Sequence, residues 1–196
     1  MRLKYKIILL KQFEAHLKKH PKRREELDKF VSRLVIEENK LLDQYNIKDI
    51  KTLWQIDPPR VATMNSLIED FKQNKTPLTG FVFLSYLPTN PDHIITFGYI
   101  EKMDIYEIFP TEEKSGEKER NFLLGGIGVD YDYRQRGLCK NMIKIIINKT
   151  KELFDYGRIY LESVSNVSNR CYMANGFQVI EYYKSKHTDT VLALDF

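Results

Sequence analysis

The chain has 196 residues, of which 42% are hydrophobic, so it carries enough apolar mass for one domain with a proper core. Its net charge of +4 is too mild to indicate nucleic-acid binding by itself, although the positive charge could serve a polyanionic cofactor. The two cysteines, Cys139 and Cys171, fit a reducing compartment better than a disulfide scaffold.

The N-terminal part of the chain predicts one strand followed by three helices. The apolar run Ile7–Leu10 is too short for the core of a signal peptide or for a membrane span, so we expect a soluble, cytoplasmic protein. Pro21 separates the first two helices, and Pro58 and Pro59 precede the third. The strand is expected over residues 4–10, and the helices over residues 12–20, 22–44 and 61–73.

The remainder predicts a mostly antiparallel sheet interrupted by two helices. Two segments rich in β-formers flank the turn sequence PTNPD, which indicates a hairpin. The fold class is therefore α+β, with N-terminal helices followed by a central, mostly antiparallel mixed sheet flanked by helices. Strands are expected over 80–87, 93–103, 121–130, 158–164, 177–184 and 190–196, helices over 136–154 and 168–175, and a charged, flexible loop over 110–120.

A basic turn opens the longer of these two helices, a pattern typical of an anion site. The turn reads Arg134-Gln135-Arg136-Gly137. Amide groups at a helix N-terminus are unpaired and carry partial positive charge, so a phosphate is stabilised there. The arginines add positive charge, and Gly137 lets the backbone approach a ligand closely. Taken alone, the turn is explained equally well as a solvated surface.

Two other phosphate-binding motifs do not fit. The P-loop pattern has no match, and the dinucleotide fingerprint begins at Gly126 and Gly128 but has Tyr131 where its third glycine belongs. That fold also needs alternating parallel strand–helix–strand units, which are not expected here. Gly125, Gly126 and Gly128 could mark only a β-bulge, an interpretation that is compatible with a ligand site.

The stretch IGVDYDYRQRGLCKNMI resembles the acetyl-CoA-binding motif of the GNAT superfamily of N-acetyltransferases. In that motif a strand ends in valine, a tyrosine–arginine pair follows, and a glycine turn opens a helix whose amides hold the CoA pyrophosphate. Val129, Tyr133, Arg134 and Gly137 fall at matching places. Cys139 departs from the usual small glycine or alanine.

The stretch SNVSNRCYMANGF resembles the second signature of the same superfamily. A helix there carries a tyrosine four residues before a Gly-Phe pair, and Tyr172, Gly176 and Phe177 match this pattern. Where the family often has an asparagine, this chain has Ser165 with Asn166 beside it. Two motifs in order, with suitable elements between them, are more specific than either alone.

The resemblance is good over residues 80–196 and loose over the first 75 residues. It implies one domain over 1–196, with a helical acceptor-side region over 1–75 and an acetyl-CoA-binding core over 80–196. It also implies transfer of an acetyl group from acetyl-CoA, as co-substrate, to a primary amine, by direct attack in a ternary complex and without a metal. The residues implied in cofactor binding are Ile127, Val129, Arg134, Gln135, Arg136, Gly137, Leu138, Cys139 and Asn166.

Catalysis requires an oxyanion donor, an acid for the departing thiolate and a base for the amine. The resemblance places the donor at a backbone amide near Val129, and Tyr172 is the candidate acid. The glycine-bearing strand, 121–129, contains no acidic residue. Glu162 is therefore slightly preferred to Glu101 as the base, and a water chain could replace either. By alternative interpretations, Tyr172 is a packing aromatic and Glu162 a surface charge.

The acceptor is not readable from the sequence. In proteins of this superfamily the early helices and hairpin loops shape its pocket, which here means Leu53–Ala62, including Trp54, and the 104–120 loop. A small polyamine, an antibiotic, a protein lysine, an N-terminal amine and an aminoacyl-tRNA are all consistent. The protein is expected to be a monomer or homodimer.

Two other functional classes stay open. The domain could bind acyl-CoA as a non-catalytic sensor, which the absence of a glutamate from the central strand favours slightly. It could also contact nucleic acid through the basic cluster over residues 18–24, although such clusters are mostly solvated. His16 and His20 have the spacing of zinc ligands on a helix, but the catalytic glutamate of that motif is missing, so no metal is expected.

Overall fold

In the computed structural model of the protein, the residues described are 2–44, 79–103, 120–163, 166–182 and 190–196. Several predicted features lie outside these ranges: the helix over 61–73, the segment Leu53–Ala62 with Trp54, the charged loop apart from Arg120, and Ser165.

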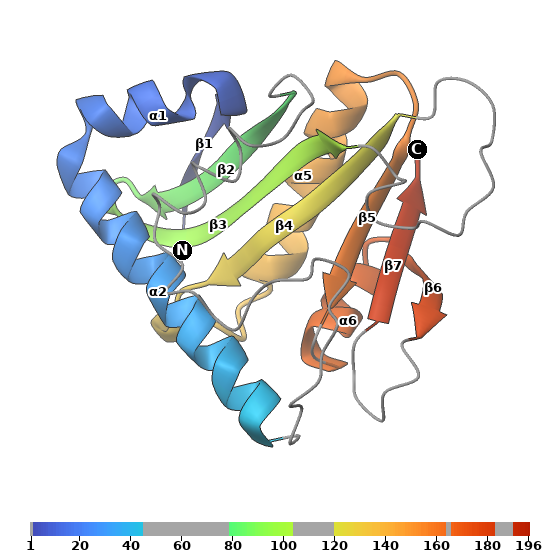
Figure 1. The fold of residues 1–196 in the computed structure, drawn as a ribbon. Coiled ribbons are helices and arrows are strands. Elements are labelled where there is room, and N and C mark those ends of the chain that lie inside the picture. The colour runs from blue at the N-terminus through green and yellow to red at the C-terminus, as the bar shows by residue number, and fades with distance from the viewer. Residues whose placement is uncertain (1, 45–78, 104–119, 164–165, 183–189) are drawn as a thin grey trace.

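Within the described ranges, a seven-stranded sheet forms the centre of the molecule (Figure 1). Its strand order is β1-β2-β3-β4-β5-β7-β6, and neighbouring strands are antiparallel except β4 and β5, which are parallel. The mostly antiparallel mixed sheet expected from the sequence is confirmed. The strands are β1 (Lys4–Leu9), β2 (Gly80–Leu87), β3 (Asn90–Met103), β4 (Asn121–Val129), β5 (Arg158–Ser163), β6 (Gln178–Tyr182) and β7 (Thr190–Asp195).

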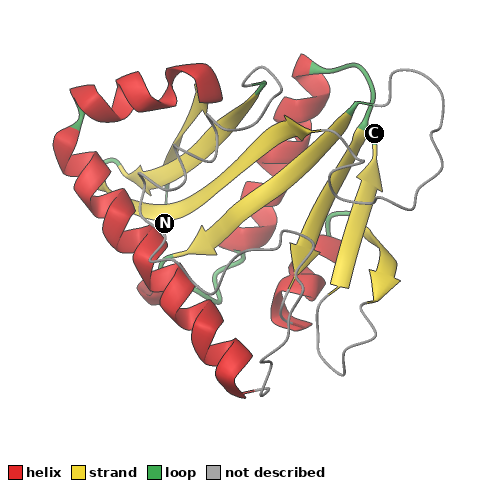
Figure 2. Ribbon diagram, in the orientation of Figure 1, coloured by secondary structure: helices red, strands yellow, loops and turns green. Residues whose placement is uncertain are grey.

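Helices cover both faces of the sheet (Figure 2). The first two pack on one face of β1 to β3, and the last two lie on the opposite face, behind the sheet in Figure 1. The helices described are α1 (Leu10–Lys19), α2 (Pro21–Gln44), α5 (Leu138–Leu153) and α6 (Asn166–Met173), together with a short 3-10 turn, η1 (Tyr131–Tyr133).

Apolar periodicity explains the two layers. Helices α1, α2 and α5 each carry one buried stripe at helical spacing, which packs against the apolar residues of the adjoining sheet face, and α6 adds the buried Tyr172. The first core contains, among others, Phe13, Leu17, Leu27, Phe30, Val82, Leu84 and Phe97. The second contains, among others, Phe122, Leu124, Met142, Ile143, Ile146, Ile159, Leu161, Tyr172 and Phe177.

Differences between predicted and observed boundaries are small and have local causes. Helix α5 begins at Leu138 rather than at residue 136, because Gly137 has a φ of 72°, which a right-handed helix does not include. Strand β3 begins at Asn90 rather than at residue 93, because the hairpin turn occupies only residues 88–89. Helix α6 begins at Asn166 rather than at residue 168.

The parallel pair of β4 and β5 opens toward its carboxyl end. Among the described residues, pairing covers only Asn121–Leu123 with Arg158–Tyr160, although β4 continues to Val129 and β5 to Ser163. We call the space between the two unpaired ends the β4–β5 opening. Helix α5 connects the two strands, so the chain contains one parallel strand–helix–strand unit, which was not expected from the sequence.

A β-bulge lies in β4 along this opening. Phe97 pairs with Gly128 and Tyr99 with Gly125, so one residue of β3 faces both Gly126 and Ile127. The expectation that the glycines of this strand mark a bulge is confirmed. A bulge bends its strand and increases the local twist, which fits the divergence of β4 from β5.

At Gly80, strands β2 and β3 lie too close together to admit a side chain. It has a φ of 148°, and a Cβ there would lie 2.0 Å from the carbonyl oxygen of Ile100 on the paired strand. Gly137 also has positive φ, but a Cβ there would meet no heavy atom within 4 Å. A side chain at Gly137 therefore meets only backbone strain, whereas a side chain at Gly80 also meets a steric clash.

We predict that Gly80→Ala lowers the free energy of unfolding by about 3 kcal/mol, because the clash involves rigid backbone. Gly137→Ala, the matched control, should lose about 1–2 kcal/mol, the cost of a left-handed residue alone. Urea denaturation of both variants tests this difference. Equal losses would show that β2 and β3 approach each other less closely than described.

Candidate functional site

The β4–β5 opening is the natural place for a ligand in this topology. In open sheets, crevices outside the carboxyl ends of parallel strands bind ligands, because the loops and helix N-termini that follow the strands gather there. Here β4 leads into η1 and the N-terminus of α5, and β5 leads toward α6. Residues from both sequence signatures therefore border the same opening.

The anion turn, residues 134–137, combines two left-handed residues. Gln135 has a φ of 61° and Gly137 a φ of 72°. Such alternation of backbone conformation turns successive amides toward a common point and favours anions. Gly137 caps α5 without a side-chain hydrogen bond, and the helical ladder begins with the amide of Asn141 donating to the carbonyl of Gly137. The amides of the first turn of α5 are therefore oriented to receive an external acceptor.

The two arginines of the anion turn are held by its own backbone and aromatic rings. Arg134 donates from Nε to the carbonyl of Val129 at 3.1 Å and lies over the Tyr131 ring, 5.4 Å from its centroid. Arg136 donates to the carbonyl of Asp132 at 3.0 Å and lies 5.4 Å from the centroid of Tyr133. Both side chains are exposed, so their positive charge is presented at the surface beside the amides.

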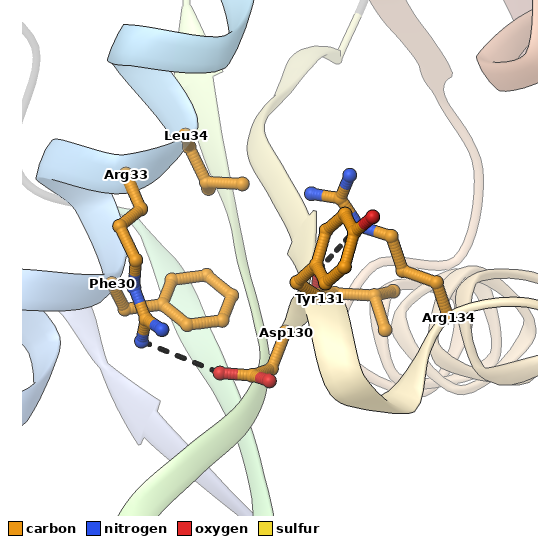
Figure 3. A pocket seen from close by; sticks show the side chains of 7 residues that line it. Phe30, Arg33, Leu34, Asp130, Tyr131 and Arg134 are labelled. Carbon is orange, nitrogen blue, oxygen red and sulfur yellow. Dashed lines mark hydrogen bonds and ion pairs between the residues drawn. The ribbon is translucent and has the colours of Figure 1, made fainter.

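Asp130 anchors the anion turn to the rest of the fold (Figure 3). Its buried carboxylate accepts the amide of Asp132 at 3.1 Å, and it pairs with Arg33 of α2 at 3.3 Å. His93 of β3 lies 3.8 Å from the same carboxylate, and the Asp130 amide donates to the carbonyl of Ile95 at 2.8 Å. A carboxylate missed by the sequence analysis thus joins the turn to a helix and a strand.

A small pocket of about 20 Å³ lies between α2 and the end of β4. Figure 3 shows the Arg33 and Arg134 side chains on either side of it, with Phe30 and Leu34 projecting from the helix. It lies on the α2 side of the turn, and its lining does not include the first residues of α5. We therefore treat it as adjacent to the anion turn rather than as the anion site itself. Its lining residues are Phe30, Arg33, Leu34, Val129, Asp130, Tyr131 and Arg134.

The remaining predicted cofactor residues fall on both sides of the opening. Ile127 is one of the two bulged residues of β4, and Val129 ends the strand two residues later. Leu138 and Cys139 form the start of α5, where both are half-buried. Asn166 is the first residue of α6, and its side chain is outside the described atoms.

The three catalytic candidates lie on different elements. Tyr172 of α6 is only 7% exposed and packs edge-on against Phe177. Both rings belong to the second core, which lies on the α5 face of the sheet and is called the α5-side core below. Glu101 of β3 is buried, and because its neighbour Ile100 belongs to that core, alternation along the strand places Glu101 on the opposite face. Glu162 lies in β5 opposite Val191, beyond the last residue paired with β4, and its side chain is outside the described atoms.

The structure brings together the two cysteines, which the sequence analysis expected as free thiols. Cys139 of α5 and Cys171 of α6 are joined as a disulfide, with their Cα atoms 6.5 Å apart. Their separation of 32 residues carries no local signal. They meet because α5 and α6 pack side by side on one face of the sheet.

The basic cluster over residues 18–24 is not uniformly solvated. Arg23 is only 6% exposed, donates to the carbonyl of Pro91 at 2.9 Å and to Nε2 of His16 at 3.1 Å, and lies over the Tyr86 ring. The cluster is therefore interrupted by an arginine that serves the fold, because the start of α2 packs against the β2–β3 hairpin. This corrects the expectation of a solvated surface at that position.

Two general features of the described residues bear on function. No group of three or more His, Cys, Asp or Glu side chains among them could hold a metal ion. None of the described helices is long and apolar enough to cross a membrane.

Comparison with known proteins finds similarity in structure alone, since no family model and no curated protein matches the sequence. The NatC complex bound to Gag peptide and CoA matches with a TM-score of 0.58 at 14% identity, covering 100% of this chain and 99% of the matched chain. A GNAT-superfamily phosphinothricin acetyltransferase from Sinorhizobium meliloti, in complex with AcCoA, gives 0.58 at 10% identity, over 100% and 89%. A GNAT-family acetyltransferase from Staphylococcus aureus Mu50 gives 0.56 at 17%, over 99% of each chain.

These matches span the whole chain and share one architecture. The chain has the fold of the GNAT-superfamily acetyltransferases. The fold expected from the two sequence signatures is confirmed.

His16 provides a test of the α1–α2 packing. Burial lowers the pKa of His16 from its ordinary 6.5 to about 4, with further lowering by the nearby charges of Lys6, His20 and Arg23. The neutral ring is therefore favoured in the folded state. Its contribution to stability is fully present above pH 6.5 and is lost as the pH falls toward 4.

We predict that the wild-type protein loses about 1–2 kcal/mol more stability than His16→Gln between about pH 7 and about pH 4.5, after allowance for solvent screening of a half-buried ring. Urea denaturation at both pH values measures this difference. His20→Gln, a variant of the exposed neighbouring ring, should keep most of the wild-type dependence. Identical pH profiles for wild type and His16→Gln would contradict the assignment.

Proposed function

We propose that the protein is an N-acetyltransferase that moves the acetyl group of acetyl-CoA to a primary amine. The observation that carries the proposal is the anion turn, with its uncapped α5 amides, at the open end of the β4–β5 pair. The same fold occurs in acetyltransferases described with AcCoA or CoA bound.

In this proposal the amides of Arg136 to Cys139 receive the CoA pyrophosphate, because they are the donors that the start of α5 leaves without a capping side chain. Arg134 and the positive φ of Gln135 complete the turn around the anion. The pantetheine arm then lies along the open edge of β4, beside Ile127 and Val129, with Asn166 on the other side. Asp130 holds the turn in position from the α2 side of the sheet.

The transfer step needs a neutral amine, although a lysine-like amine has a pKa near ~10.4. Its nitrogen attacks the thioester carbonyl, and a backbone amide of the bulged strand near Val129 donates to the developing oxyanion. The C–S bond then breaks, the amine proton passes to a base, and Tyr172 protonates the thiolate. The products are the acetylated amine and CoA.

The base for the amine has two candidate residues, whereas the acid has one. Glu162 lies on β5 beyond its pairing with β4, and thus beside the opening, which supports its slight preference. Glu101 lies on β3, so β4 separates it from the opening, and its side chain lies on the sheet face opposite to Tyr172. A water chain through the opening remains the third route.

The acceptor class is proposed only as a primary amine. One structural neighbour is described with a peptide and another is a phosphinothricin acetyltransferase, so this fold accommodates both polymeric and small acceptors. The pocket between α2 and β4 is small and shares Val129 and Arg134 with the proposed cofactor residues, so an amine that approaches from the α2 side would lie beside the cofactor.

A non-catalytic acyl-CoA sensor is the second candidate. The observation that favours it is the position of the catalytic candidates: Tyr172 is packed in the core, and Glu101 is buried on the other face of the sheet. A sensor needs the anion turn but not a converging acid and base. Turnover with an amine panel separates the two candidates.

We predict that Arg136→Ala weakens acetyl-CoA binding about tenfold, because it removes a charge beside the pyrophosphate amides. Lys151→Ala is the matched control, since it removes an equally exposed charge at the far end of the same helix. Calorimetric titration should show nearly unchanged affinity for the control. Equal losses in the two variants would indicate general electrostatic attraction rather than a local anion site.

We also predict that Tyr172→Phe lowers kcat by roughly 100-fold while the Kd for acetyl-CoA changes little, because the hydroxyl acts only as the C–S bond breaks. The ring and its contact with Phe177 are retained. Tyr156→Phe, at an exposed tyrosine, should leave kcat unchanged.

Measuring kcat, Kd and melting temperature together distinguishes the interpretations of Tyr172. A purely packing residue gives lower stability or affinity with kcat unchanged, whereas a sensor gives no turnover before or after substitution. Wild-type kcat in Tyr172→Phe on a confirmed acceptor would remove this residue from the mechanism.

A further inference from the structure

The disulfide between Cys139 and Cys171 joins the two segments that carry the sequence signatures. Its Cα–Cα distance of 6.5 Å lies within the range found for native disulfides. These are the two cysteines of the chain, so no other thiol competes for either partner. Both side chains are half-buried at the edge of the α5-side core, where a small reagent can reach them.

Each cysteine occupies a position that matters for the proposed site. Cys139 lies in the first turn of α5, among the amides that face the anion turn. Cys171 directly precedes Tyr172 on α6. Because α5 follows β4 and α6 follows β5, the bond connects the two sides of the β4–β5 opening.

We propose that Cys139 and Cys171 form a reversible thiol-oxidation site whose redox state sets the affinity of the protein for CoA ligands. The inference rests on the proposed function, because it concerns the same cofactor site. The oxidant is a low-molecular-weight disulfide, RSSR.

Oxidation proceeds by two thiol–disulfide exchanges. The Cys139 thiolate attacks one sulfur of RSSR, which forms a mixed disulfide and releases RS⁻. The Cys171 thiolate then attacks the Cys139 sulfur and displaces the second RS⁻. The protein loses two electrons and two thiol protons, and RSSR gains two electrons to become two thiols. Cys139 is the first attacker because a helix N-terminus favours its thiolate form.

The bond affects binding because α6 is short. A helix of eight residues is not stable by itself and depends on its tertiary anchors. Two of these anchors are the buried Tyr172 ring and the Cys171 bond to α5. In the oxidised state both sides of the opening are already fixed relative to the anion turn, so less ordering is needed when a ligand binds. Reduction frees α6 to move relative to α5 and weakens binding.

The experiment compares wild-type protein oxidised with glutathione disulfide and reduced with a phosphine. Desulfo-CoA is the ligand, because it has no thiol to exchange with the protein. Alkylation followed by intact mass measurement counts free thiols, and calorimetric titration gives Kd. We expect no free thiols after oxidation, and about five- to tenfold tighter binding by the oxidised protein.

Cys171→Ser serves as the matched variant, because it removes the bond without changing the first turn of α5. It should bind desulfo-CoA like reduced wild type whether or not glutathione disulfide is present. The comparison between the two redox states of the wild type does not depend on the folding of this variant, which a melting curve checks.

The outcomes separate the inference from the proposed function. Binding that is equal in oxidised and reduced wild type, or two free thiols after oxidation, would overturn the inference alone and leave the cysteines as packing residues. Absence of desulfo-CoA binding in every form would overturn the proposed function and this inference with it.

Discussion

The short parallel pairing of β4 with β5 is the constraint on which the rest of the site depends. Only three positions of each strand pair within the described residues, and beyond them the strands diverge. Antiparallel neighbours on either side keep both strands in the sheet, so the divergence produces an opening rather than a break. The connection through α5 then places a helix N-terminus, with its uncapped amides, at the mouth of this opening.

The two faces of the sheet contribute different residues to that opening. Helices α5 and α6 supply the anion turn, Tyr172 and the cysteine pair from one face, whereas α2 supplies Arg33 and the wall of the pocket from the other. Asp130 links the faces, because its backbone follows β4 into the turn and its carboxylate pairs with α2. A ligand on the turn and an acceptor near α2 would therefore meet through the space between β4 and β5.

The cysteine pair adds a covalent connection to this non-covalent arrangement. Helix α6 is held to the sheet chiefly by apolar contacts around Tyr172 and Phe177, and the bond to α5 fixes its distance from the anion turn. If the protein is an acetyltransferase, cofactor binding and thiol chemistry act on the same pair of helices. Under the redox proposal, a cysteine at position 139 in place of the usual glycine or alanine affects cofactor binding.

Local pattern by itself determined most of the elements and the position of the anion turn. Helical periodicity, proline and glycine signals and the Arg134–Gly137 turn act over a few residues, so the sequence alone predicted α5, β4, the bulge and the fold they imply. Only the tertiary structure decided the Cys139–Cys171 bond, the burial of Arg23 and the pairing of Asp130 with Arg33. Each of these joins segments far apart in the chain, and their contact depends on how helices pack on a twisted sheet. That packing depends on the sum of many apolar contacts, so it cannot be predicted from the spacing of individual residues in the sequence.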